Sequence, residues 1–112
     1  MKKIEAIIRP TKVAEVCGAL EEAGHVGLTL SEVEGRGMQK GVVHKVRGKD
    51  YRVDLLPKVR LEVVVQNAEV EKVVQAIREA AFTGEIGDGK LFILPVDDAI
   101  RVRTNQRGDL AL

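Results

Sequence analysis

Residues 59–96 read VRLEVVVQNAEVEKVVQAIREAAFTGEIGDGKLFILPV and contain three structural patterns in succession. Apolar side chains alternate with Arg60 and Glu62 over residues 59–65, which predicts a strand with one buried face. A second set of apolar residues recurs at helical spacing, with Glu and Lys on the other face: Val70, Val73, Val74, Ile77, Ala80 and Ala81. The apolar run over 91–96 predicts another strand. This half of the chain therefore has the order β-α-β.

The first half of the chain repeats that order. Residues 3–9 are rich in isoleucine and end before Pro10, which predicts a first strand. Thr11 is the predicted N-cap of a helix, whose end is marked by Gly24. The apolar stripe of this helix has i, i+3, i+4, i+7 spacing and consists of Val13, Val16, Cys17 and Leu20. Residues 26–33 then return to strand character.

The two halves together predict an α+β fold, a ferredoxin-like βαββαβ sandwich formed by one domain over residues 1–112. Two helices would cover one face of a four-stranded sheet. The other face would be rich in valine, isoleucine and leucine and exposed, and large exposed apolar patches usually mark interfaces. We therefore expect a homo-oligomer. Residues 100–103 are expected to form one more short extended segment.

Residues 35–57 separate the two halves and contain four glycines and many charges. A segment of this length without regular structure is uncommon inside a compact domain unless it has a function. Residues 42–46 and 51–53 also fit the strands of a β-hairpin with a turn at 47–50. A hairpin and a functional loop are compatible interpretations.

Composition narrows the classes of function. The formal net charge is +1, and Tyr51, Phe82 and Phe92 are the only aromatic residues, which argues against a broad nucleic-acid surface. Cys17 is expected to be a buried small hydrophobe in a reducing, cytoplasmic compartment. No stretch approaches the roughly 20 apolar residues of a membrane span, and the N-terminus has no signal-peptide pattern, so we expect a protein that is not membrane-inserted.

Residues 83–92, TGEIGDGKLF, place three glycines and Lys90 in one turn before a predicted strand. Glycines let backbone N–H groups approach an anion closely, and lysine adds a point charge, so this composition suits a phosphate. The segment is not a Walker A loop, because Leu91 stands where the magnesium-binding Ser or Thr is required and the loop leads into a strand.

Other polar residues have weaker signals. Arg101 and Arg103 would share one face of an extended segment and suit an oligophosphate, or else be solvated at an edge. Asp88 either binds a metal or stabilises its turn. His25 and His44 are isolated and are expected at the surface. No pair of residues has the pattern of a general acid and base, so we do not expect an enzyme.

Five motifs make the chain similar to the PII nitrogen-regulatory signal proteins along its whole length: KIEAIIRP at 3–10, GRGMQKG at 35–41, LPK at 56–58, TGEIGDGKLF at 83–92 and RVRT at 101–104. The resemblance implies a homotrimer that binds ATP or ADP in clefts between subunits. It also implies a T-loop, at about residues 37–57, that docks on a regulated enzyme or membrane transporter. Nitrogen metabolism is the expected context.

The resemblance further assigns residues to ligands. Those expected to hold the nucleotide phosphates are Gly87, Asp88, Gly89, Lys90, Arg101 and Arg103. Those expected to line the nucleoside side are Thr29, Gly35, Arg36, Gly37, Met38 and Val64. A second effector, 2-oxoglutarate, is expected beside magnesium-ATP, with Gln39 as metal ligand and Lys58 paired with a carboxylate. Lys40, Gly41, Ile86 and Gly87 would border that effector.

The chain departs from the family pattern in its loop. The usual YRGAEY segment is VRGKDY here, and its last residue, Tyr51, aligns with a tyrosine that some members uridylylate. An unmodified exposed tyrosine is the alternative. Other readings are a PII-like sensor of nucleotide and a different metabolite, acting outside nitrogen control, a slow nucleotide hydrolase using Lys90 and the arginines, and a structural module without ligand.

Overall fold

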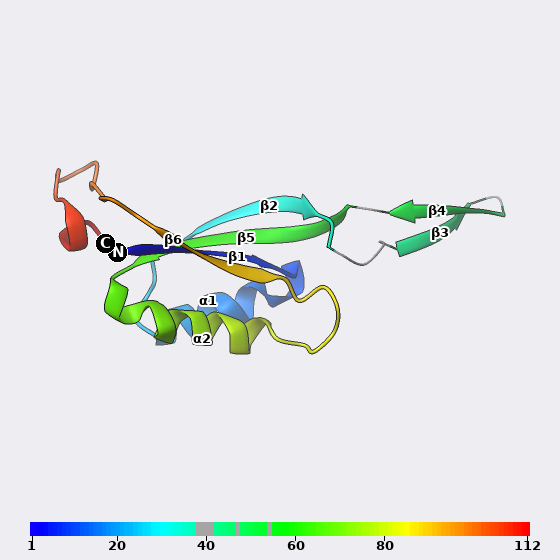
Figure 1. Ribbon diagram of the computed structural model, residues 1–112, viewed down its shortest axis with the longest axis horizontal. Coiled ribbons are helices and arrows are strands. Elements are labelled where there is room, and N and C mark those ends of the chain that lie inside the picture. Colours follow the sequence, from blue (N-terminus) through cyan, green and yellow to red (C-terminus); the bar gives the residue numbers. More distant parts are fainter. Residues whose placement is uncertain (38–41, 47, 54) are drawn as a thin grey trace.

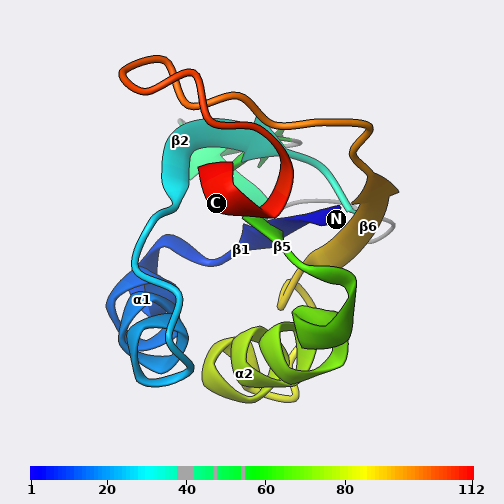
Figure 2. The ribbon, with the colours of Figure 1, turned by 90° about the vertical axis from the view of Figure 1, so that its left-hand side faces the viewer.

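The computed structural model of the protein describes residues 1–37, 42–46, 48–53 and 55–112, with the backbone course alone for 42–46 and 49–53. Four strands form an antiparallel sheet in the order β2-β5-β1-β6. Their bounds are β1 Lys2–Ile8, β2 Thr29–Gly35, β5 Leu56–Val65 and β6 Lys90–Pro95. Helices α1 (Val13–Glu22) and α2 (Val70–Ala81) lie on one face of this sheet (Figures 1 and 2). The predicted α+β, ferredoxin-like sandwich is confirmed.

The core lies between the two helices and the central strands. Alternate residues of β1 and β5 are buried, among them Ile4, Ile8 and Leu61. Both predicted helical stripes face this core, since Val16 and Leu20 of α1 and the α2 stripe are buried or packed against it. Cys17, which was predicted to be buried, is only half-buried and packs at the margin of this core. Among the described residues, neither helix is both long and apolar enough to span a membrane.

The ends of α1 show where sequence signals decided local structure and where they did not. The amide of Gly24 (φ +90°) donates to the carbonyl of Glu21, and the amide of His25 donates to that of Leu20. These two bonds form a Schellman motif, which confirms Gly24 as the end of the helix. The predicted N-cap was wrong, because Thr11 lies inside a 3-10 helix, η1 (Pro10–Lys12), and makes no capping bond. A second 3-10 helix, η2 (Asn67–Glu69), likewise precedes α2.

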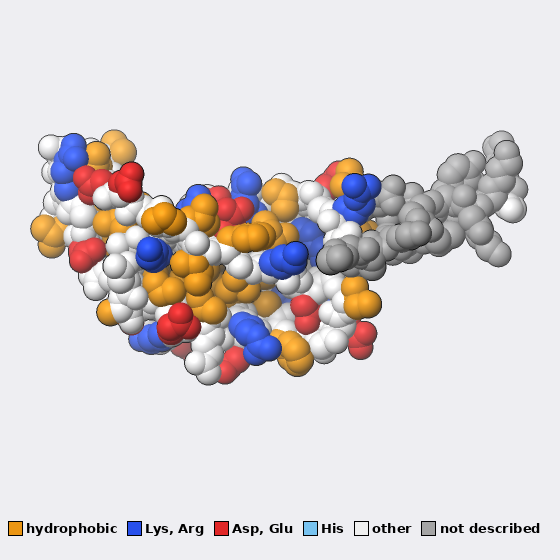
Figure 3. Space-filling model, in the orientation of Figure 1, with side chains coloured by type: hydrophobic (Ala, Val, Ile, Leu, Met, Phe, Trp, Pro, Cys, Tyr) orange, Lys and Arg blue, Asp and Glu red, His pale blue; other side chains and the backbone are white. Residues whose placement is uncertain are grey.

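The sheet face away from the helices is less apolar than predicted. On β1 and β5, the residues that alternate with the core include Lys3, Glu5 and Ile7, paired in register with Val64, Glu62 and Arg60. On β6 this face carries the exposed side chains of Phe92 and Leu94, opposite Glu5 and Lys3, whereas the exposed Ile93 lies opposite the core residue Ile4 and points to the helix side. Figure 3 shows apolar side chains along that side, interspersed with Lys and Arg. The expectation of a broadly apolar second face is therefore only partly correct.

The insertion between β2 and β5 contains the predicted hairpin. Its strands are β3 (Val42–Val46) and β4 (Lys49–Val53), with His44 opposite Tyr51. The second strand begins two residues earlier than predicted. The hairpin forms a sheet of its own and extends beyond the end of the four-stranded sheet (Figure 1).

The segment after β6 differs from the prediction. Ile100 forms a single bridge with Arg107, and residues 102–104 form a turn instead of an extended segment. The amide of Asn105 donates to the carbonyl of Arg101, at 2.8 Å. Arg101 and Arg103 therefore do not share a strand face, and that sequence-based reason for pairing them was wrong. The 3-10 helix η3 (Gly108–Ala111) follows.

Candidate functional site

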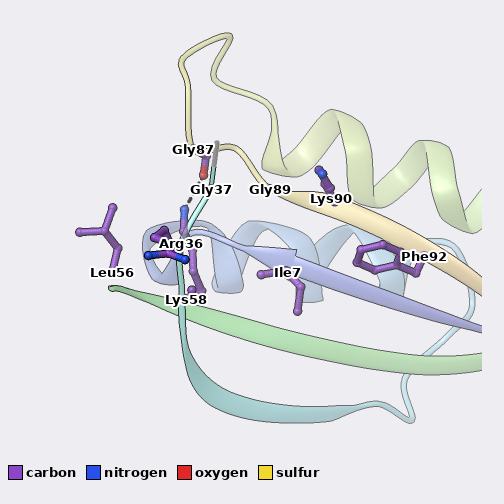
Figure 4. Close-up of a pocket in the computed structure, with 10 residues that line it drawn as sticks. Ile7, Arg36, Gly37, Leu56, Lys58, Gly87, Gly89, Lys90 and Phe92 are labelled. Carbon is purple, nitrogen blue, oxygen red and sulfur yellow. Dashed lines mark hydrogen bonds between the residues drawn. The ribbon is translucent and has the colours of Figure 1, made fainter. Parts of the chain in front are cut away.

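A cleft of about 600 Å³ opens at the end of the sheet that faces the hairpin (Figure 4). Strands β1, β2, β5 and β6, the residues after β2 and the loop before β6 supply its walls. Its lining residues are Ile7, Gly35, Arg36, Gly37, Leu56, Lys58, Gly87, Gly89, Lys90 and Phe92. Most of these were predicted from the sequence, although the segments that carry them lie far apart in the chain. Ile7, Leu56 and Phe92 were not predicted.

The loop before β6, residues 83–89, is called the glycine loop. Its three glycines have positive φ angles, +87° at Gly84, +103° at Gly87 and +101° at Gly89, which disfavour any residue with a Cβ atom. Gly89 has a second constraint, since a Cβ atom there would overlap the carbonyl oxygen of Ile7. The loop backbone thus packs directly on β1.

Asp88 organises the glycine loop from within. Its carboxylate accepts bonds from the Thr83 and Gly84 amides, each at 2.9 Å, and from the Thr83 hydroxyl. The hydroxyl bond, followed by these amide bonds and Arg9, holds the pKa of Asp88 well below its ordinary value. The carboxylate does not line the cleft. Of the two interpretations left open by the sequence, the geometry favours stabilisation of the turn.

Two cationic side chains bond the glycine loop to the sheet: Arg9, directly after β1, and Lys58, in β5. The Arg9 guanidinium donates to the Ile86 carbonyl at 2.8 Å and to the Asp88 carboxylate at 3.2 Å. The Lys58 ammonium donates to the Gly87 carbonyl at 2.6 Å (Figure 4). Burial, and secondarily the neighbouring Arg9 charge, lower the pKa of Lys58 from its ordinary value, while Asp88 opposes them.

Arg9 was missed by the sequence analysis, although a signal for it existed. The register of β1 against β6 pairs Ile7 with Lys90, and that against β5 pairs Ile8 with Val59. Continuing both registers by one or two residues places Arg9 beside Asp88 and Lys58. An antiparallel pairing of the first and last strands, once assumed, would have predicted this contact.

The cleft combines charge with apolar surface. Arg36, Lys58 and Lys90 supply three cations, whereas Ile7, Leu56 and Phe92 supply apolar walls. Carboxylate side chains do not line it among the described residues. This combination suits an anion that carries a flat or apolar group.

Other predicted residues lie elsewhere. Thr29 and Val64 pair with Glu62 and Lys3, toward the far end of the sheet, and Ile86 is exposed beside the cleft. The segment with Arg101 and Arg103 follows β6 and lies at the opposite end of the sheet from the glycine loop (Figure 1). Met38, Gln39, Lys40 and Gly41 lie outside the described residues, as does the side chain of Tyr51.

The fold and the site define a class, a small ferredoxin-like protein with an anion-suited cleft at the base of a long insertion. Comparison with known proteins narrows this class. Residues 1–106 match the family described as "Nitrogen regulatory protein P-II". The chain is 53% identical over its whole length to "Nitrogen regulatory protein P-II 2" of Methanothermobacter thermautotrophicus, covering 97% of that protein.

Two further relatives, each named "Nitrogen regulatory protein P-II", are covered completely by this chain over its full length. They come from Azospirillum brasilense, at 51% identity, and from Synechocystis, at 52% identity. The chain belongs to the P-II family of nitrogen regulatory proteins. The resemblance inferred from the five motifs is confirmed.

Proposed function

We propose that this protein is a trimeric signalling regulator that binds ATP or ADP in clefts between subunits and controls a partner through its T-loop. Membership of the P-II family supports a regulator of nitrogen metabolism. The cationic, glycine-lined cleft supports the nucleotide. The three cations would bind phosphate oxygens, and the apolar walls would contact the nucleoside.

One observation carries the proposal that the site is shared between subunits. The glycine loop precedes β6, whose first residue is Lys90, and Arg101 and Arg103 follow that strand. The length of β6 separates the two groups by roughly 20 Å, more than a triphosphate spans. If both groups bind one nucleotide, they come from two copies of the chain.

The uncovered sheet face supports association of such copies. It presents charges of both signs, Lys3, Glu5, Arg60 and Glu62, next to apolar side chains. Arg60 and Glu62 form an ion pair within the chain, with Nε and Oε1 3.4 Å apart.

The second proposed effector is 2-oxoglutarate, which would bind together with magnesium-ATP. Lys58 is bonded to the Gly87 carbonyl and its ammonium has further N–H donors, so a carboxylate that pairs with Lys58 would share this ammonium with the glycine loop. Effector binding would therefore alter the loop that holds the phosphates, which is a physical route for coupling the two ligands. Magnesium would link the phosphates to the keto acid, with the Gln39 carboxamide as its protein ligand.

We propose that the protruding hairpin is the segment that contacts the regulated enzyme or transporter. It stands clear of the four-stranded sheet, and its backbone groups belong to no larger sheet. Its position between β2 and Leu56 places both ends of the insertion at the cleft, where Gly35, Arg36 and Gly37 contribute one wall. The occupant of the cleft would bias the arrangement of this segment and so its binding to an enzyme or transporter.

Mixed trimers test the shared site. Lys90→Ala and Arg103→Ala should each abolish ATP binding in calorimetry, because each removes one side of every cleft. Subunits of the two variants, unfolded and refolded together, should recover binding in those clefts that combine two intact sides. Arg78→Ala, on the exposed face of α2, is the matched control and should bind like the parent. A mixture that forms trimers but does not bind ATP would contradict a shared site.

A further inference from the structure

Arg9 occupies a position that the proposed ligand contacts do not include. It directly follows β1, and its side chain is 29% exposed. The guanidinium bonds the Ile86 carbonyl with Nη2 and the Asp88 carboxylate with Nε. Arg9 is therefore bonded to the residues immediately before and after Gly87 in the glycine loop. It does not line the cleft.

Both Arg9 and Lys58 contact Gly87 closely. A Cβ atom at Gly87 would lie 3.2 Å from Nη2 of Arg9, so the guanidinium packs against the backbone there. Lys58 bonds the Gly87 carbonyl as well. The carbonyls of Ile86 and Gly87 are both held by cations, and each peptide plane carries its N–H opposite its C=O. These bonds consequently set the directions of the Gly87 and Asp88 amides.

We propose that Arg9 is a positioning residue for the phosphate site: its forked guanidinium locks the glycine loop in the conformation that receives the nucleotide. This inference rests on the proposed nucleotide site and deepens it. Arginine suits the task because its fork presents several donors in one rigid plane. A lysine ammonium at the same position would carry the charge without that planar fork.

The chain of contacts extends beyond Arg9. Asp88 accepts the Nε bond and also holds the Thr83 and Gly84 amides, so Arg9 reaches the start of the loop through this carboxylate. The residues in contact are expected to act together and not additively. Loss of Arg9 should therefore loosen the whole segment 83–89 and leave the helices and the central strands unchanged.

Hydrogen–deuterium exchange of the ligand-free protein tests this directly. In Arg9→Gln, amides of residues 83–89 should exchange about tenfold faster, the effect of losing a charge-assisted bond, while the rest of the described chain exchanges like the parent. ATP affinity should fall by a similar factor of about ten. Arg9→Lys should restore only part of both. In an Asp88→Asn background, Arg9→Gln should have a smaller effect.

Lys12→Gln is the matched control, because the Lys12 side chain is 23% exposed and pairs with Glu15, in the first turn of the following helix α1, instead of with the glycine loop. It should leave exchange and affinity at parent values. Unchanged loop exchange in Arg9→Gln, full rescue by Arg9→Lys, or faster exchange throughout the protein would each overturn the positioning role. A parent protein that binds no ATP would overturn the proposed function instead, and the exchange of the ligand-free variants would still decide the role of Arg9.

Discussion

The glycine loop and the segment over residues 97–108 are built alike but anchored differently. Cations proposed to bind phosphate accompany each region: Lys90 directly follows the glycine loop, and Arg101 and Arg103 lie within 97–108. Each region is also organised by one aspartate that accepts bonds from backbone amides. Asp88 accepts from Thr83 and Gly84, and Asp98 accepts from Ala99 and Gly108. Hydrogen bonds lower the pKa of both aspartates from the ordinary value; the Thr83 hydroxyl is the largest cause at Asp88, and the Ala99 amide is the largest at Asp98.

The difference lies in what each aspartate joins. Asp88 also accepts a bond from Arg9, which directly follows β1, so the glycine loop is tied to the sheet. The cation of Asp98 is Arg107, from the same segment, at 2.9 Å. The first region is therefore fixed in place within one chain. The second is held mainly by bonds within itself, which is compatible with the proposal that Arg101 and Arg103 contact a second copy of the chain.

The largest expected effect comes from Gly89→Ala. The added Cβ would overlap the Ile7 carbonyl, and the positive φ is strained for alanine, so unfolding free energy should fall by about 3 kcal/mol or more. Gly108→Ala is the control in the other region, since its φ is +64° but no atom lies within 4 Å of the new Cβ. It should cost about 1 kcal/mol. Urea titration measures both, and equal losses would contradict the difference in anchoring.

Acid should weaken the glycine loop. Because Asp88 has a pKa far below its ordinary 3.8, its ionised form stabilises the fold above that pH, and this contribution is lost progressively as pH falls below 3.8. Urea titrations at pH 5 and pH 3 should show a smaller difference in Asp88→Asn than in the parent, because the amide does not titrate. The same two titrations on Asp98→Asn measure the pH difference in unfolding free energy that comes from the segment over residues 97–108. An unchanged pH difference in Asp88→Asn would refute this role.

Lys58→Met should reduce unfolding free energy only slightly but remove the coupling between 2-oxoglutarate and ATP binding. The variant keeps the apolar stem but loses the bond to the Gly87 carbonyl, which should cost about 1 kcal/mol. Calorimetry should show that 2-oxoglutarate no longer tightens ATP binding. Lys3→Met, on the same sheet face and 31% exposed at its side chain, is the control and should retain the coupling. Retained coupling in Lys58→Met would remove Lys58 from the effector site.

Arg101→Ala should have the smallest effect on stability. Its side chain is exposed and donates one bond to the Leu112 carbonyl at 3.2 Å, so unfolding free energy should change by no more than about 0.5 kcal/mol. ATP affinity should nevertheless fall about tenfold or more, as for a lost charge-assisted contact. Thermal melts and calorimetry on the same preparation test the contrast. Unimpaired ATP binding would exclude Arg101 from the phosphate site.

The same two regions show how far sequence reasoning reaches. The glycine loop was predicted to bind an anion because its glycines and Lys90 are close together in the chain, and the structure places Gly87, Gly89 and Lys90 on the cleft. The extended segment at 100–103 was wrong, because a four-residue run of alternating apolar and charged residues cannot be told from a turn by periodicity. Thr11 failed as an N-cap because a 3-10 turn at Pro10 precedes the helix.

Local patterns in this sequence determined the elements, their order and the end of α1, because strand alternation, helical spacing and a C-terminal glycine act over only a few residues. The motifs along the chain also sufficed to place it in its family. Only the tertiary structure decided that Arg9, Lys58 and Asp88 meet at one loop, since their contacts depend on the registers of β1 with β5 and β6. It also separated Lys90 from Arg101 by the length of β6, because an extended strand carries its two ends to opposite edges of the fold.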